Sequence, residues 1–296
     1  NHEPARPGQA LAPGDIVTFR GSPYQAEPGG QGRIQLVRTH PLEPATGPVR
    51  AHCGYHKCLT RYTRSVYSRA CRFAGPRGRS FRHYFHRLDA FHDDAPGRPV
   101  SSISGHALDL ALYPDIRVVR FIRDPRDLVV SGYFYHKRGA EHWCELPDPT
   151  DLDWLKVNGR VPGGLPAGQS LTNWLNAASL EEGLHAELDF RQYHFDSMLA
   201  WPADDPRVRV YRYEDILGHE TRVFREILSF LELPWPARLR GWDAARRHRA
   251  SSRQGRTDHI RDPRSEQWRR YFTPSLQRAF NERYGDVLER YGYPLE

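Results

Sequence analysis

The sequence predicts an α/β fold in which a parallel sheet is covered by helices on both faces. Three segments carry this prediction, because each joins a run of strand-forming residues to a stretch of helical periodicity; they begin at Val49, Ile116 and Val208. Repeated strand-then-helix units favour a parallel sheet, since each helix returns the chain to the edge where it started. At 296 residues the chain is long enough for one such domain with a sizeable core.

The segment before the first unit has a different character. Residues 1–48 are rich in proline and glycine and contain two short β-like runs, 16–19 and 34–37, with a Gly-Gly turn between them. We therefore expect an arm or hairpin packed on the main domain, which spans 49–296.

The first two units have recognisable boundaries. Alternation through 49–55 predicts a strand, and helical spacing over 59–73 predicts a helix after a short loop. The apolar strand 116–122 is followed by Asp124, which suits a helix N-cap, and by Pro125, which suits the first helical position.

The rest of the chain is less regular. A strand at 208–213 precedes an amphipathic helix over 221–231, and Thr273 opens a last helix. The stretch 140–200 has weak periodicity, which indicates loops and short helices over an active-site mouth. The arginine-rich stretch 238–257 indicates a mobile basic loop.

The charge balance points to anionic partners. The formal net charge is +7, and lysine occurs only at Lys57, Lys137 and Lys156, so nearly all cations are arginine. Arginine suits bidentate contacts to phosphate or carboxylate, although a compositional bias explains such an excess equally well.

Other classes of protein are excluded by composition. No apolar run approaches the roughly 20 residues of a membrane span. The four cysteines, Cys53, Cys58, Cys71 and Cys144, are too few for a disulfide framework, so reduced thiols are expected. We expect a cytoplasmic location, with a removed signal or anchor left open because the sequence begins at Asn1.

Two segments carry candidate chemistry. The loop from His56 to Arg61, with the sequence HKCLTR, joins a strand to a helix start, where unpaired N–H groups, the helix dipole and Lys57 can hold an anion. It lacks the Walker A pattern. In the second unit, Arg123 at the carboxyl end of the strand and Ser131 in the next helix can converge on one anion.

These segments resemble the sulfotransferase superfamily. HKCLT resembles the 5′-phosphosulfate loop P-K-S-G-T-T, and RDPRDLVVS, from Arg123 to Ser131, resembles the 3′-phosphate motif. YRYEDI (211–216) resembles the third core-strand signature, and RDPRSEQWRRYFT (261–273) resembles the C-terminal segment. The resemblance implies a P-loop-like three-layer fold with a central, mostly parallel sheet flanked by helices. It also implies transfer of a sulfuryl group from 3′-phosphoadenosine 5′-phosphosulfate (PAPS), leaving PAP, to a hydroxyl or amine.

The resemblance assigns roles to individual residues. Lys57 would hold the bridging and sulfuryl oxygens, and Thr60 with the amides of the loop would bind the 5′-phosphate. The same resemblance places the following residues around the nucleotide: His56, Cys58, Leu59, Arg61, Tyr62 against the adenine, Arg123 and Ser131 at the 3′-phosphate, Tyr213, Arg261 and Arg264.

The chain departs from the family pattern at two places. Leu59 replaces the loop glycine, so the loop must avoid positive φ or bind the phosphate differently, and Arg61 replaces the second threonine. Pro263 and Glu266 stand where the C-terminal segment has glycines, which leaves the arginine that closes over the nucleotide unassigned.

A general base is also needed. A histidine suits neutral pH, and His106 follows the run 99–104 as the catalytic histidine does in the cytosolic branch of the family; a structural role for His106 and a Glu141 base both stay open. No metal site is expected at His52 or Cys53, because neighbouring strand residues face apart and no second ligand pair is present.

Other functions remain as alternatives. A nucleotide-dependent kinase of P-loop fold lacks its lysine context and a magnesium ligand, and a polyanion-binding protein lacks any recognised nucleic-acid motif. Glu214 and Asp215 are interpreted as anchoring residues and not as a catalytic pair. The expected partner is a small-molecule or glycan acceptor, not a nucleic acid, and the oligomeric state cannot be inferred.

Overall fold

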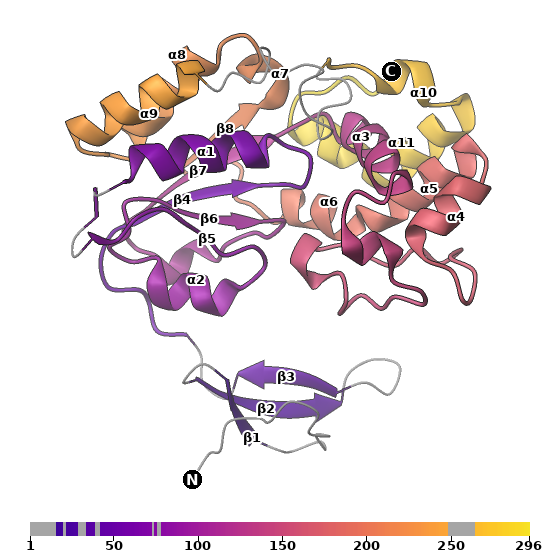
Figure 1. The fold of residues 1–296 in the computed structure, drawn as a ribbon, viewed down its shortest axis with the longest axis horizontal. Helices are drawn as coiled ribbons and strands as arrows, with labels where there is room; N and C mark the ends of the chain where they lie inside the picture. Colours follow the sequence, from indigo (N-terminus) through magenta and orange to yellow (C-terminus); the bar gives the residue numbers. More distant parts are fainter. Residues whose placement is uncertain are drawn as a thin grey trace. The chain divides into compact units, whose positions relative to one another are not determined.

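A five-stranded, fully parallel sheet forms the centre of the larger of two units (Figure 1). Its order is β5-β6-β4-β7-β8, and every neighbouring pair is parallel. Its strands are β4 (Val49–Gly54), β5 (Arg82–His83), β6 (Ser101–Ser104), β7 (Ile116–Ile122) and β8 (Val208–Arg212). The predicted α/β class with a parallel sheet is thereby confirmed.

The chain divides into Asn1–Pro44 and Ala45–Glu296. The computed structural model describes residues 16–19, 22–28, 34–38, 42–72, 74–75, 78–247 and 264–296. The division lies close to the boundary expected from the sequence, and the packing of the first unit on the second stays a prediction.

The smaller unit contains a three-stranded antiparallel sheet. Its strands are β1 (Ile16–Phe19), β2 (Ser22–Pro28) and β3 (Ile34–Arg38), with β2 in the middle. The expectation of two strands was therefore incomplete. Pro23 and Pro28 obscure β2 in the sequence, because proline lacks an amide donor and is rare inside sheets.

Side chains of the central strands alternate between two hydrophobic layers. On β7, Val118 belongs to one buried cluster, whereas Val119 and Phe121 belong to the other. In Figure 1 helix α1 lies over one face of the sheet and α2 over the other. The sheet is thus covered on both faces, which explains why β7 carries buried apolar side chains on both of its sides.

Helices make up most of the remainder. The α-helices are α1 (Thr60–Ala70), α2 (Leu88–Asp94), α3 (Pro125–Lys137), α4 (Leu171–Ala177), α5 (Leu180–Phe190), α6 (Gln192–Leu199), α7 (Tyr213–Ile216), α8 (Glu220–Phe230), α9 (Trp235–Arg247), α10 (Trp268–Tyr271) and α11 (Pro274–Arg290). Among the described residues, 3₁₀ turns occur at η3 (Leu110–Leu112), η4 (His142–Glu145) and η5 (Leu155–Val157).

The predicted helix starts of α3 and α11 are confirmed. The Asp124 carboxylate accepts the Arg126 backbone N–H at 2.9 Å, with Pro125 at the first helical position. The Thr273 hydroxyl accepts the Leu276 backbone N–H at 3.2 Å. Each cap satisfies a donor that the first turn leaves unpaired.

Loops and short helices were expected over 140–200 and are found there, whereas the loop expected at 238–257 was wrong for residues 238–247, which lie in α9. Within 140–200 the chain forms α4, α5 and α6, and α5 begins with a capping box in which Ser179 and Glu182 bond each other's backbone N–H groups.

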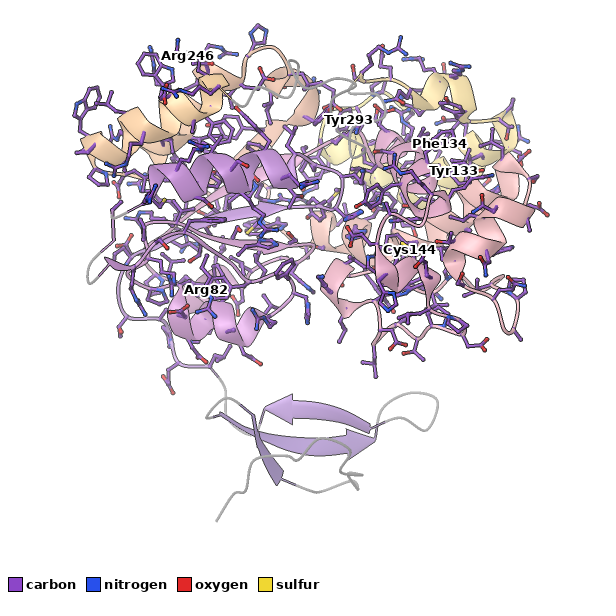
Figure 2. All side chains as sticks on the ribbon, viewed as in Figure 1. Arg82, Tyr133, Phe134, Cys144, Arg246 and Tyr293 are labelled. Atoms are coloured by element: carbon purple, nitrogen blue, oxygen red, sulfur yellow. The ribbon has the colours of Figure 1, made fainter. Side chains whose placement is uncertain are left out.

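The start of the arginine-rich stretch is helix α9, which continues to Arg247; residues 248–257 lie outside the described residues. Small residues face inward, because a Cβ on Gly241 would lie 2.6 Å from the Leu228 side chain. The arginines take the outer face, as Arg246 shows in Figure 2.

Two sequence expectations about class can be compared with the structure. Cys53, Cys58, Cys71 and Cys144 are all free and buried, the last within the helical layer of Figure 2, so reduced thiols are confirmed. Among the described helices, none combines the length and apolar character of a transmembrane span.

Candidate active site

Three neighbouring strands end at the same edge of the sheet, and each is followed by a predicted site residue. β4 leads into the loop 55–59, β6 leads through Gly105 to His106, and β7 leads to Arg123. From β4 the chain continues to β5 and β6 on one side of it and then crosses to β7 on the other side, so this edge contains the switch point at which α/β sheets bind ligands. The fold therefore brings Lys57, His106 and Arg123 to the edge of the sheet at which the strands have their carboxyl ends.

The loop 55–59 makes a tight turn into α1. Lys57 and Leu59 both adopt left-handed backbone angles, with φ of 72° and 55°. The Cys58 N–H donates to the Tyr55 carbonyl at 3.0 Å, and the Thr60 hydroxyl donates to the same carbonyl at 3.3 Å. Of the two possibilities open for Leu59, avoidance of positive φ is thus wrong: leucine takes the conformation that glycine adopts without strain.

Lys57 is half-buried, near other cations and an aromatic ring. Its Nζ lies 3.7 Å from the centroid of the Tyr135 ring. Burial, and then the neighbouring Arg191 and Arg123 charges, lower the pKa of Lys57 to about 7. Since an anion at this point would relieve the repulsion, the ammonium group is poised to accept a negatively charged ligand.

Arg123 directly follows β7 and is 3% exposed. One Nη donates to Asp127 at 3.4 Å and to the Arg264 carbonyl at 3.2 Å, and the guanidinium stacks 4.3 Å above the Tyr213 ring. Its Nε is buried without a hydrogen-bond partner among the described residues. Because Arg123 lowers the pKa of Lys57, the two cations share one electrostatic environment.

The other residues predicted to contact the nucleotide differ in how buried they are. Ser131 is half-buried on α3, and Arg61 is exposed on α1. Tyr62 is buried and donates its hydroxyl to the Ala245 carbonyl at 3.1 Å, with its ring against Phe224. Whether that ring also lies against adenine stays a prediction.

The C-terminal arginines are only partly described. Arg264 is exposed, and its backbone carbonyl, not its side chain, is what the structure places on Arg123. Arg261 lies outside the described residues.

His106 lies among other histidines at the end of β6. Burial and then the His86 charge lower the pKa of His106 to about 4, so its imidazole is unprotonated near neutral pH. Its Nε2 is buried without a hydrogen-bond partner in the described part of the chain. The neutral imidazole is the form that can accept a proton, while a pKa of about 4 makes it a weaker base than a histidine that titrates near neutral pH.

Glu141, the alternative base, is already engaged by two donors. The Tyr135 hydroxyl donates to it at 2.9 Å and the Trp143 indole N–H at 2.8 Å. Glu214 acts as an anchor: it accepts the Asp124 N–H at 3.0 Å and the Tyr293 hydroxyl at 2.8 Å.

The side chains of His52 and Cys53 lie on opposite faces of the sheet, in different buried environments. The His52 ring packs against Phe121, with its Nδ1 3.3 Å from the Tyr67 hydroxyl. Cys53 belongs to the other buried cluster. Within the described residues no group of three or more His, Cys, Asp or Glu side chains is arranged to hold a metal ion.

Three buried nitrogen atoms around the loop have no partner among the described residues: His56 Nε2, Arg123 Nε and Arg191 Nη2. Unsatisfied buried donors are costly, and here they accompany Lys57, whose Nζ faces an aromatic ring. This donor set fits a multiply charged anion such as a nucleotide bisphosphate, whose oxygens would satisfy it.

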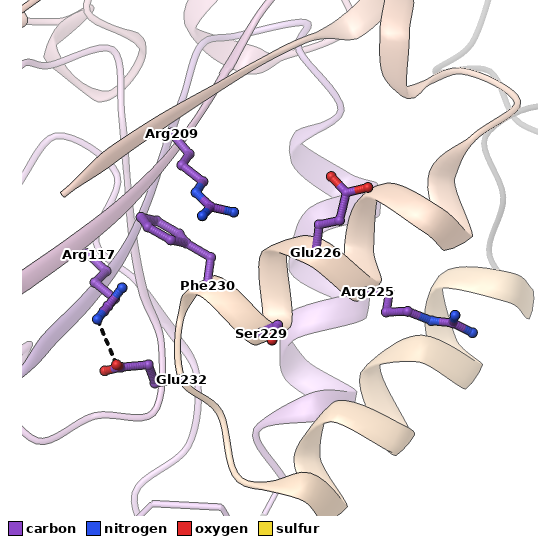
Figure 3. A pocket seen from close by; sticks show the side chains of 7 residues that line it. All are labelled: Arg117, Arg209, Arg225, Glu226, Ser229, Phe230 and Glu232. Carbon is purple, nitrogen blue, oxygen red and sulfur yellow. Dashed lines mark hydrogen bonds and ion pairs between the residues drawn. The ribbon is translucent and has the colours of Figure 1, made fainter. Parts of the chain in front are cut away.

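A wide hollow of about 520 Å³ lies elsewhere, at the amino ends of β7 and β8 (Figure 3). Arg117, Arg209 and Phe230 line it, and Arg117 is already paired with Glu232 at 2.7 Å. It contains none of the predicted site residues, so we do not assign the chemistry to it.

Comparison with family models decides the class. The sulfotransferase domain model matches residues 38–292, which is most of the chain. The chain belongs to the sulfotransferase domain family. The resemblance inferred from the short motifs is thereby confirmed, and with it the predicted enzyme class and PAPS as the sulfuryl donor of that class.

Solved structures similar to this sulfotransferase domain are distant in sequence. Mouse sulfotransferase SULT7A1 complexed with PAP is 16% identical, with a TM-score of 0.49, and 83% of this chain and 86% of that chain are covered. Retinol dehydratase in complex with androsterone and inactive cofactor PAP is 14% identical, with a TM-score of 0.44 and 90% coverage of both chains. Comparison with curated proteins gave no match.

The sequence patterns missed one part of the site of this sulfotransferase domain. Arg191, Glu187 and His136 are fully buried and adjoin the loop 55–59, but none lies in a recognised motif. A glycine in the middle of α3, Gly132, was the available indication, because glycine inside a helix often marks a close approach.

We predict that acid destabilises the sulfotransferase domain through its buried histidines. Burial lowers the pKa of His52 to about 3 and those of His83 and His106 to about 4, below the usual 6.5. The folded chain thus prefers neutral imidazoles, and their contribution is complete above pH 6.5 and is lost as the pH falls towards 4.

Urea unfolding at pH 7, 6 and 5 measures this loss. Each such histidine adds a slope of at most about 1.4 kcal/mol per pH unit. His52→Gln should therefore flatten the decline, whereas the exposed His142→Gln should not; equal slopes in the two variants would contradict the assignment.

Proposed function

We propose that the chain transfers a sulfuryl group from PAPS to a hydroxyl or amine of a carbohydrate or small-molecule acceptor, by in-line displacement at the carboxyl edge of the sheet. The observation that carries this proposal is a group of cations at a strand-to-helix loop, in which the half-buried Lys57 lies near the buried Arg123 and Arg191, whose side chains keep unsatisfied nitrogen atoms. The family match supports the reaction class, and the acceptor belongs to the proposal.

Different residues would bind different parts of the nucleotide. The N–H groups at the start of α1 and the Thr60 hydroxyl would bind the 5′-phosphate, where the helix dipole favours negative charge. Arg123 and Ser131 would bind the 3′-phosphate, and Tyr213 supports the Arg123 guanidinium. When bound, PAPS supplies a sulfur atom activated by its bond to a phosphate leaving group.

Transfer then requires two events at opposite sides of the sulfur. His106 accepts the proton of the acceptor O–H or N–H as the new bond to sulfur forms. Lys57 in its ammonium form neutralises the charge that gathers on the bridging oxygen as the old S–O bond breaks, leaving PAP. No metal is required in this scheme.

Thermal shift with three ligands tests the function. Selective stabilisation by PAP over ATP and over a generic oligonucleotide is expected, because binding to the folded state alone raises the melting temperature. Preference for ATP would favour the kinase alternative, and preference for the oligonucleotide would favour the polyanion-binding alternative. Release of PAP from PAPS with a panel of phenols and glycans would then identify the acceptor.

We predict that Arg123→Lys removes the preference for a 3′-phosphate. Lysine keeps the charge but not the fork of donors, and a hydrogen bond to a charged group contributes about 1.5–3 kcal/mol, or about 10- to 150-fold in affinity. Calorimetry with PAP and with adenosine 5′-monophosphate measures the ratio of the two dissociation constants. A ratio equal to that of the wild type would remove Arg123 from the 3′-phosphate site.

A further inference from the structure

Arg191 connects two helices to the loop that carries Lys57. It follows α5, precedes α6 and has no exposed surface. Its Nε donates to Glu187 at 2.8 Å, and one Nη donates to the backbone carbonyl of His56 at 3.1 Å. The bonded carbonyl belongs to the peptide unit that leads into Lys57, so the guanidinium holds the backbone immediately before the reactive side chain.

Glu187 is itself held in place from a third element. Its second oxygen lies 2.6 Å from Nδ1 of His136 on α3, and both side chains are fully buried. A Cβ on Gly132 would lie 1.8 Å from the Glu187 carboxylate and 2.5 Å from Arg191 Nη2. The glycine therefore lets α3 approach the pair, and the chain His136, Glu187, Arg191, His56 carbonyl is closely packed throughout.

Stability alone does not account for this arrangement. A buried ion pair contributes little net stability, because desolvation offsets the attraction. Arg191 also keeps a buried Nη2 without a partner among the described residues. Its charge lowers the pKa of Lys57, which is faced as well by Arg123, Arg138, Glu141, the Tyr135 ring and His56.

We propose that Arg191 is a positioning residue: clamped by Glu187, it fixes the His56 carbonyl and thereby sets the left-handed backbone that aims Lys57 into the site. The proposal rests on the proposed function, because the orientation of Lys57 matters only if that residue acts on a sulfuryl donor. Arg191 acts through the loop and is not assigned a step of its own.

The variants remove the clamp without leaving one charge buried alone. Glu187→Met with Arg191→Met replaces both partners by apolar side chains of similar size, and Arg191→Lys keeps the charge but shortens the reach. Asp189→Asn with Arg283→Met is the matched control, since it removes a partly exposed pair, joined at 2.7 Å, between Asp189 on the same helix as Glu187 and Arg283 on α11.

The first readout needs no ligand. Hydrogen exchange of the peptide covering 55–62 should become at least tenfold faster in the double methionine variant, while a peptide covering β7 exchanges as in the wild type. Arg191→Lys should show the same local change even if the double variant does not fold. Unchanged exchange of 55–62 in Arg191→Lys would overturn the proposal.

The second readout separates this proposal from the function. If wild-type protein does not bind PAP, the proposed function fails. With PAP binding established, we expect PAP release from PAPS, with water as the acceptor, to fall at least tenfold in the double variant. The upper pH limit of activity should also move upward, because loss of the Arg191 charge removes one cause of the lowered pKa of Lys57. If the double variant had the same activity and the same upper pH limit as the control, the proposed role of Arg191 would be overturned, but the proposed function would not.

Discussion

Lys57→Met is expected to lower turnover by about 10²- to 10³-fold, the usual loss when a group that stabilises transition-state charge is removed. Methionine fills a similar volume but carries no charge to the bridging oxygen. PAP release from PAPS measures the effect. The matched control is Arg69→Met, an exposed cation in the last turn of α1 with no assigned role, which should stay within threefold of the wild type.

The same variant should be more stable than the wild type. The folded-state pKa of Lys57, about 7, lies below the usual 10.5, so folding opposes its charged form at neutral pH. The melting temperature of ligand-free Lys57→Met should therefore rise while its activity falls. A variant that lost activity and stability together would instead indicate a structural role for Lys57.

The lowered pKa also gives a pH dependence with a definite sign. Above about pH 7 free Lys57 loses its proton, so kcat/KM for PAPS should fall about tenfold per pH unit. Lys57→Arg, which stays charged, should lack this limb. An identical limb in that variant would assign it to another group.

His106→Ala is expected to reduce turnover by about 10²- to 10⁴-fold, the range for a general base, with the PAP dissociation constant unchanged. The imidazole is neutral above about pH 4 and its Nε2 has no partner among the described residues, so its loss removes a proton acceptor and no packing bond of that nitrogen. PAP release and calorimetry measure the two quantities.

Two further variants distinguish His106 from Glu141 as the general base. Glu141→Gln should retain activity within tenfold, because its carboxylate already accepts from Tyr135 and Trp143. His142→Gln, an exposed neighbour, controls for general effects of a histidine change. Full turnover in His106→Ala together with a large loss in Glu141→Gln would transfer the role to Glu141.

The parts of the fold that the sequence predicted are those with local causes. The strand 116–122 and the caps at Asp124 and Thr273 depend on residues within a few positions of one another. By contrast, the short helices expected within 140–200 were given no bounds, although Ser179 begins α5 with a regular capping box, because the prolines and tryptophans in this stretch masked its periodicity.

The candidate site divides in the same way. Lys57 and Arg123 follow strands in short motifs, and the parallel sheet brings them together without further information. The clamp of His136, Glu187 and Arg191 joins α3 to α5 and to a loop more than a hundred residues earlier in the chain, at His56. No pattern within one segment encodes such a contact, since tertiary packing alone creates it.

The conformation of Leu59 has a consequence for how similar loops are searched for. A left-handed leucine costs of order 1–3 kcal/mol, and here its side chain packs against the hydrophobic core in partial compensation. A search written in residue letters, with glycine obligatory at this place, would pass over the chain. A template written in backbone angles, with left-handed residues on either side of Cys58, would recover it.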